Sequence, residues 1–239
     1  GILLAYLGRY EEAIQADGQT LDIYREVGYA YGMARMYNNR GYSIGKILPT
    51  DPQVEAHYRE AYALFDKFED AYMRGITLVH LGEAAEALGR YDEAIDWLIQ
   101  AVEIFRKTKH MRWFVISLTA LGYSQILIGD YGGAATHLDE ALEVGQQFQL
   151  VNDSKRVLAS AAALFSKRNK EELAAVTAYH LLNDSTVYAE VSSLCETLIS
   201  EISREPDPLD LKKAQTRGES ISFGALQTLV GSELSAANV

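Results

Sequence analysis

The chain has 239 residues, of which 48% are hydrophobic and 23% charged, and its formal net charge at pH 7 is -11. A surface this acidic repels phosphate backbones, so we expect no direct contact with nucleic acid. The sequence contains no run of about 18 apolar residues and therefore predicts no membrane span. The single cysteine, Cys195, excludes an internal disulfide framework and is expected in the core beside Leu194 and Leu198. These features favour a cytoplasmic protein.

The sequence repeats itself with a period of about 40 residues. The block Gly-Arg-Tyr-Glu-Glu-Ala-Ile at residues 8–14 returns as Gly-Arg-Tyr-Asp-Glu-Ala-Ile at 89–95 and, more loosely, at 129–135. An earlier series of glycines keeps the same period in steps of 40, 41 and 40: Gly1, Gly41, Gly82 and Gly122. Repeats of this length are supersecondary elements that bury their apolar faces only by stacking, so we expect one continuous solenoid.

Each repeat is predicted to contain two helices, because apolar residues such as those over 95–105 follow the i, i+3, i+4 spacing. At Gly82 and Gly122 we expect a close crossing of the two helices, where a Cβ would push them apart. At Gly89 and Gly129 we expect a positive φ that ends the first helix. The expected repeats are, in chain order, 1–28, 29–68, 69–108, 109–148 and a degenerate fifth over 149–183.

Two repeats depart from this pattern. In the second, Arg40 replaces the usual Leu, and Leu48-Pro49-Thr50-Asp51-Pro52 replaces the turn block, which predicts a longer and stiffer turn with a proline in the first turn of the next helix. In the fifth, Asn169 stands at the turn and can adopt the left-handed conformation that glycine supplies elsewhere.

The remaining residues are expected to cover the end of the stack. Residues 184–204 are predicted to form an amphipathic capping helix that opens at Ser185. Pro206 and Pro208 then break the helix and begin a C-terminal helical extension over 205–239. The elements expected in this extension are a short helix from Leu209 that stops at Arg217-Gly218, a final amphipathic helix over 223–234 and a frayed end over 236–239.

The motifs resemble the tetratricopeptide repeat in its long version. Leu81-Gly82, Gly89-Arg90-Tyr91, Ala94 and Ala101 match that pattern, and the set from Leu121 to Ala141 matches it as well. The resemblance covers about the first 180 residues. It implies an all-α fold, an α-α superhelix in which antiparallel helix pairs stack as a solenoid, with C-terminal capping helices.

A narrower resemblance concerns the end of the chain. The stretches Ala178-Tyr179-His180-Leu181-Leu182 and Lys213-Ala214-Gln215-Thr216-Arg217-Gly218 resemble the C-terminal sensor region of large bacterial STAND-type signalling ATPases and of transcriptional regulators similar to the maltose-regulon activator and the SARP type. The resemblance implies a sensor that receives an inducer or a regulatory protein and acts on upstream modules of the same chain. By register Gly1 lies midway through a helix, so we expect preceding residues to complete it in a larger parent.

The sequence predicts no enzyme, and we expect no catalytic residue, cofactor or metal. The stretch 41–47 looks faintly like a P-loop but lacks its spacer and the Ser/Thr after Lys46. The five histidines have no spacing that would chelate a metal from one helix face. Acidic pairs such as Glu11-Glu12 and Asp92-Glu93 fall in the first turn of second helices, where they complement the helix dipole.

What remains is a binding surface on the first helices, which line the concave groove of such stacks. Arg35 can pair with a carboxylate, Asn38 can bond an extended backbone, and an Ile/Val patch can hold an apolar side chain. Glu83 and Glu86 would repel acidic peptide tails. The candidate partner-binding residues are Arg35, Asn38, Asn39, Tyr42, Ile76, Val79, His80, Glu83, Ile116, Thr119, Tyr123 and Arg156. The same residues could instead pack against further repeats of the parent.

The leading hypothesis is a non-catalytic, ligand-sensing interaction module of a larger bacterial signalling ATPase or transcriptional regulator, which binds a protein or peptide, or a small-molecule inducer, in this groove. Occupancy would pass to upstream modules as a change in superhelix curvature. Two alternatives stay open. One is a structural scaffold or self-association module, and the other is a peptide-pheromone receptor, motivated by Asn38 and Asn39, although that class is expected to carry asparagines in several repeats.

Overall fold

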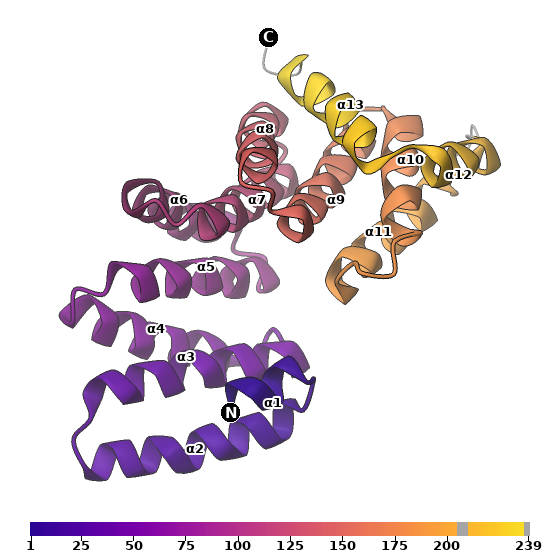
Figure 1. Cartoon of the computed structure of the whole chain (residues 1–239). Coiled ribbons are helices and arrows are strands. Elements are labelled where there is room, and N and C mark those ends of the chain that lie inside the picture. The colour runs from indigo at the N-terminus through magenta and orange to yellow at the C-terminus, as the bar shows by residue number, and fades with distance from the viewer. Residues whose placement is uncertain (205–209, 237–239) are drawn as a thin grey trace. The chain divides into compact units, whose positions relative to one another are not determined.

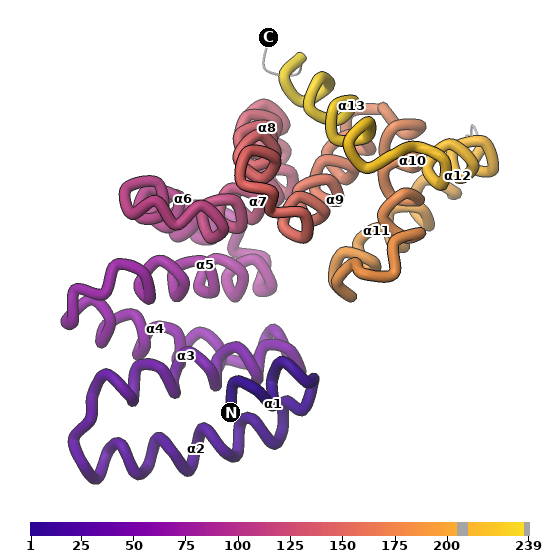
Figure 2. The backbone as a smooth tube through the Cα atoms, viewed as in Figure 1, coloured from indigo at the N-terminus to yellow at the C-terminus, as the bar shows by residue number. Residues whose placement is uncertain are grey.

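The computed structural model describes residues 1–204 and 210–236, and every regular element in these ranges is a helix (Figure 1). Within each unit, the two helices of each repeat pack against each other as an antiparallel pair joined by a short turn, as the tube in Figure 2 shows. The all-α fold of tetratricopeptide-like helix pairs is thereby confirmed. The predicted break at Pro206 and Pro208, the start at Leu209 and the end after residue 236 lie outside the described residues.

The chain divides into two compact units, residues 1–110 and 111–239. The boundary falls between the third and fourth predicted repeats. The repeated glycines do not mark it, since Gly82 and Gly122 each pack against the second helix of their own pair.

The first unit contains three helix pairs. Its helices are α1 (Ile2–Tyr6), α2 (Tyr10–Glu26), α3 (Ala30–Ile47), α4 (Pro52–Lys67), α5 (Ala71–Ala87) and α6 (Tyr91–Thr108). The second pair begins α4 as its sequence predicts, with Pro52 at the first helical position and the Asp51 carboxylate accepting a hydrogen bond from the backbone N–H of Gln53 at 2.8 Å.

The second unit contains two further pairs and three C-terminal helices. They are α7 (Met111–Ile128), α8 (Tyr131–Gln147), α9 (Val151–Lys167), α10 (Glu171–Leu182), α11 (Ala189–Ile202), α12 (Leu211–Ser220) and α13 (Phe223–Ala236). By length and composition α7 could cross a membrane, but slightly more than half of it is buried against its neighbours α8 and α9. Its apolar character is therefore that of a core helix in this unit.

The repeated small residue inside each first helix has the steric role predicted for it. A Cβ built on Gly82 of α5 would lie 2.7 Å from Cγ of Leu98, and one on Gly122 of α7 would lie 2.8 Å from Cγ of Leu138. Both leucines are fully buried on the second helix of the same pair. The close crossing of paired helices is confirmed, since a side chain at either glycine would separate them.

The first turns that carry the repeated glycine or its asparagine substitute also have their predicted conformation. Gly89 and Gly129 have φ of 71° and 82°, and Asn169 takes their place in the fifth repeat with φ of 57°. Each follows the first helix of its pair.

A second series of left-handed residues ends the second helices, and the sequence does not reveal it. It keeps the same period but changes residue type: Gly28, Glu69, Lys109 and Gln149, with φ between 53° and 71°. Side chains other than Gly, Asn and Asp rarely adopt this region, so Glu, Lys and Gln carry no signal of it. In the first, third and fourth repeats, both turns therefore close through a residue of positive φ.

The C-terminal helices differ from the prediction in two places. The capping helix α11 begins at Ala189 and not at Ser185, since Tyr188 is its N-cap and Asp184 forms a turn by accepting hydrogen bonds from the backbone N–H and hydroxyl of Thr186. The predicted stop at Arg217-Gly218 is also wrong. Helix α12 continues to Ser220, because Gly218 lets α12 approach α10 closely, and a Cβ there would lie 2.7 Å from the carbonyl oxygen of Val176.

A buried ion pair fixes the start of this C-terminal region. The Lys155 ammonium on α9 is almost fully buried and lies 2.6 Å from the carboxylate of Asp184 and 2.7 Å from the hydroxyl of Thr186. The hydrogen bond from Lys155 holds the pKa of Asp184 well below its usual value. Helix α11 then packs on α9 and α10, while α12 packs on α10 and α13 packs on α8.

Candidate functional site

Several of the predicted groove residues are not on the surface. Asn38 of α3 is buried, and its side-chain oxygen accepts a hydrogen bond from the Thr77 hydroxyl at 3.3 Å and lies 3.2 Å from Nδ1 of His80. Burial, assisted by the charge of Lys46, lowers the pKa of His80 to about 4. The imidazole is therefore neutral, and Nδ1 donates to Asn38. The Asn38 amide thus joins α3 to α5 inside the unit and is not presented to a partner.

The prediction of surface exposure is wrong for five of the twelve candidates. Asn38, Ile76, Val79, His80 and Thr119 are each at most 9% exposed. Counting along one helix face cannot reveal this, because other helices of the same unit pack over part of that face. Asn38, Ile76, Val79 and Thr119 act in the core, while His80 also reaches the wall of a small cavity.

A small cavity lies beside this buried cluster, at the C-terminal ends of α3 and α5 with α4 behind them. Its volume is about 100 Å³. The side chains and backbone that line it are Tyr42, Gly45, Lys46, Pro49, Val54, Tyr58, His80, Glu83, Ala84 and Ala87. Of the predicted site residues, Tyr42, His80 and Glu83 come together here.

Three aromatic rings form one side of this pocket. The ring of His80 lies 5.0 Å from that of Tyr58 and 6.1 Å from that of Tyr42, measured between centroids. Tyr58 reaches this position because Gly41 has no side chain, and a Cβ there would lie 2.7 Å from the Tyr58 ring. Burial and the charge of Glu83 raise the pKa of Tyr58, so its phenol stays protonated.

The pocket also carries one charge of each sign. Lys46 is exposed, and its ammonium lies 5.3 Å from the centroid of the Tyr42 ring, within cation–π distance. Glu83 is also exposed and acts electrostatically on Tyr58. Of the charged and aromatic residues of this pocket, Lys46 and Tyr58 were missed in the sequence. Lys46 lies one helical turn beyond Tyr42 and could have been found by extending the count, whereas Tyr58 comes from α4 and gives no signal.

The other predicted residues lie elsewhere. Arg35 is exposed and Asn39 is half-buried on α3, and neither lines the pocket. In the second unit, Ile116 and Tyr123 of α7 are half-buried. Arg156 of α9 is held within that unit: its guanidinium lies 2.6 Å from the Glu190 carboxylate and stacks over the ring of Tyr188. Any role of these residues in binding stays a prediction.

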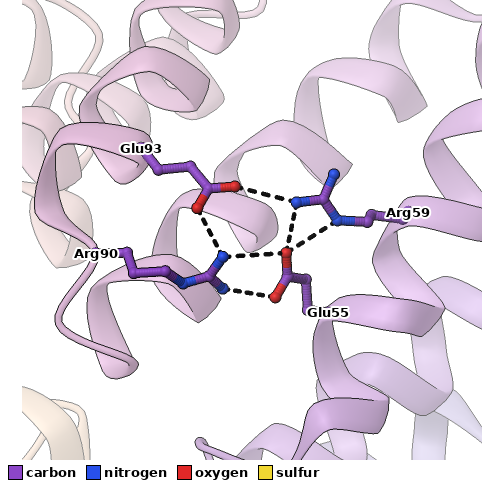
Figure 3. Close-up of polar contacts among 4 residues, drawn as sticks. All are labelled: Glu55, Arg59, Arg90 and Glu93. Atoms are coloured by element: carbon purple, nitrogen blue, oxygen red, sulfur yellow. Dashed lines mark hydrogen bonds and ion pairs between the residues drawn. The ribbon is translucent and has the colours of Figure 1, made fainter.

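An ion-pair network joins the second helices of two adjacent repeats (Figure 3). Glu55 of α4 accepts hydrogen bonds from Arg59, at 2.6 Å, and from Arg90, at 2.5 Å, and Glu93 of α6 accepts from the same two arginines at 3.0 and 2.7 Å. The two arginines hold the pKa of Glu55 below its usual value. Because every charge in the network is matched, it is a structural tie between α4 and α6.

The second unit has a wider and shallower cavity of about 530 Å³ at the start of α10, beside α12 and α13. Four of its five charged side chains are paired with one another: Lys170 with Glu233, and Arg217 with Glu172 at 2.9 Å. Over the described residues, no group of three His, Cys, Asp or Glu side chains is placed to hold a metal ion.

Comparison with known proteins bears on the family. Models of the tetratricopeptide repeat match residues 1–27, 53–107 and 73–147. No curated protein matches the chain significantly. Among solved structures, the chain is similar to the crystal structure of BtubC (BKLC) from P. vanneervenii, with 13% sequence identity and a TM-score of 0.64 over 95% of this chain and 91% of that chain. Similarity at this identity shows the fold alone. The stretches matched by the family models make up about half of the chain, which therefore belongs to the tetratricopeptide-repeat family.

Proposed function

We propose that the first unit binds an extended peptide segment of a partner protein across the exposed parts of α3 and α5, with one side chain of the peptide in the pocket of Tyr42, Tyr58 and His80. Tetratricopeptide repeats are protein-interaction modules, and the observation that carries the proposal is this preformed pocket with aromatic walls and a charged mouth. Pockets of this kind supply specificity in peptide recognition.

The size of the pocket favours a peptide over a small-molecule inducer. Sites that enclose a drug-sized ligand usually measure about 300 to 1,000 Å³. A cavity of about 100 Å³ holds a single side chain. For the first unit, binding of a small-molecule inducer is therefore the weaker hypothesis and binding of a peptide the stronger one.

The buried state of Asn38 weighs against a peptide-pheromone receptor. That reading needs the Asn38 amide to bond the backbone of a peptide, but its oxygen is already committed to Thr77 and His80. Self-association is a separate outcome, which light scattering over a range of protein concentrations would reveal as a mass that rises to that of a dimer.

The regulatory setting of the module is also part of the proposal. The stretches Ala178–Leu182 and Lys213–Gly218, which carry the resemblance to signalling ATPases, lie together: Nδ1 of His180 is 3.1 Å from the carbonyl oxygen of Gly218. We infer a cytoplasmic sensor module that acts on upstream modules of a larger chain. A Gly-x-x-x-x-Gly-Lys-Ser/Thr loop encoded upstream of Gly1 in the same reading frame would support this setting, and its absence would count against it.

Peptide binding can be tested without knowing the partner. A random 12-residue peptide library displayed on phage is selected on the immobilised full chain, and the enriched peptides are synthesised and titrated. We expect Tyr42→Ala to weaken their binding at least ten-fold, since it removes one wall of the pocket. The control is Ile99→Ala, which removes an exposed apolar side chain from α6 and should leave binding unchanged. Equal affinity for Tyr42→Ala and the unmodified chain would overturn the proposal, as would a selection that enriches no peptide.

A further inference from the structure

The pocket of the first unit already holds a cation against its aromatic wall. The Lys46 ammonium lies 5.3 Å from the centroid of the Tyr42 ring, and Lys46, Tyr42, Tyr58, His80 and Glu83 all line the same cavity. A ring face is electron-rich and attracts a cation placed over it. An ammonium from the chain itself thus shows which chemistry the pocket accepts.

The remaining lining residues fit a cation better than an anion. Tyr58 keeps its proton and His80 is neutral, so neither ring brings a charge of its own. Glu83 supplies the carboxylate that would pair with an incoming ammonium or guanidinium, and such charge-assisted hydrogen bonds are about twice as strong as neutral ones. Lys46 is exposed on a flexible stem, so its ammonium competes with an incoming cation for the face of the Tyr42 ring.

The charge of the whole chain points in the same direction. The formal net charge is -11, so a basic segment is attracted to this protein and an acidic one is repelled. Glu86, one turn after Glu83 on α5, adds a further negative charge to this helix.

We propose that the pocket of Tyr42, Tyr58, His80 and Glu83 recognises a basic side chain, arginine or lysine, of the partner peptide, and that this side chain takes the place over Tyr42 that the Lys46 ammonium occupies in the free protein. This inference rests on the proposed peptide binding. It adds the chemical class of the partner and an intramolecular competitor for the same site.

Two substitutions, each of which removes one charge of the pocket, distinguish recognition of a basic side chain from recognition of an acidic one. For peptides enriched from the displayed library, Glu83→Gln should weaken binding about five- to ten-fold, because it removes the partner of the incoming cation. Lys46→Met keeps an unbranched side chain one atom shorter but removes the competing charge, so it should strengthen binding several-fold. A pocket that instead takes an acidic group on Lys46 gives the reverse signs, and that result would overturn the proposal.

The enriched peptides provide a second readout. We expect one position to be occupied by Arg or Lys, and its replacement by norleucine to remove the effect of Glu83→Gln. Glu60→Gln is the matched control, since it removes one negative charge at an exposed site of α4 outside the pocket. If the enriched peptides depend on Tyr42 but carry an apolar or acidic residue at the position that enters the pocket, the proposal of a basic side chain is refuted and the proposal of peptide binding stands. Peptides indifferent to Tyr42 would refute both.

Discussion

Replacing Gly82 by Ala should destabilise the first unit, although alanine is the better helix former. The new Cβ would lie 2.7 Å from Cγ of Leu98 and 3.0 and 3.2 Å from its two methyl carbons. Leu98 is 1% exposed, so its whole branched end must move within a packed interface. Overpacking of this kind costs roughly 1 to 3 kcal/mol, and the helix propensity of alanine returns about 1 kcal/mol. We expect a net loss of about 1 kcal/mol in the free energy of unfolding.

The assay is equilibrium urea unfolding followed by far-UV circular dichroism, with Gly45→Ala as the matched control. Gly45 lies in α3 with a negative φ, and a Cβ there would meet Val54 no closer than 3.5 Å, which is an ordinary contact. That substitution should stabilise the unit by about 0.5 to 1 kcal/mol. Equal shifts of the urea midpoint for the two variants would refute the steric account of the repeated glycine.

Three further predictions concern turns and charges. Glu69→Gly should raise the free energy of unfolding by about 1 kcal/mol in the same urea assay, since Glu69 has φ of 53° and glycine adopts that conformation without strain. Because the folded pKa of Asp184 is lowered, its contribution to stability is complete above the unfolded pKa of about 4 and is lost as pH falls toward the folded value. The test range runs from about pH 5 to about pH 3, on either side of the unfolded pKa of about 4. Over this range the urea midpoint should fall less for Asp184→Asn than for the unmodified chain. Arg90→Ala should cost up to about 1 kcal/mol at low salt and less in about 1 M NaCl, where the Debye length is about 3 Å; Arg9→Ala, which removes only the exposed pair with Glu12, should have no measurable effect.

The fold could be predicted from the sequence because its signals are steric and repeated. Gly82 and Gly122 mark the close crossings, and Gly89 and Gly129 mark the first turns. The steric role of these four glycines is therefore sufficient to locate the helix pairs. The second turns could not be predicted, since Glu69, Lys109 and Gln149 have a positive φ that their residue types rarely adopt. Their position follows from where the second helix must stop.

The candidate site was predicted only in part, and the reason is geometric. A helix face read from sequence shows which residues share a side, so Tyr42 and Glu83 were found. It does not show that the adjacent helix covers part of that side, which is why Asn38 and Val79 were expected on the surface. Residues that α4 brings in, such as Tyr58, have no relation to the groove positions in sequence spacing.

The C-terminal helices show the same limit. Cys195 and Leu198 of α11 were correctly placed in the core, and burial raises the pKa of Cys195 to about 12. The start of α11 was missed because Asp184 is tied to Lys155, a residue 29 positions earlier on α9. Interactions over such distances decide helix ends that local sequence leaves open.

The most direct test of the account is a calorimetric titration of an enriched peptide into the unmodified chain and its Tyr42→Ala and Lys46→Met variants. Binding through the pocket predicts a loss of at least ten-fold in affinity for Tyr42→Ala and a gain of several-fold for Lys46→Met. One dissociation constant shared by all three proteins would contradict the claim that this pocket is the binding site.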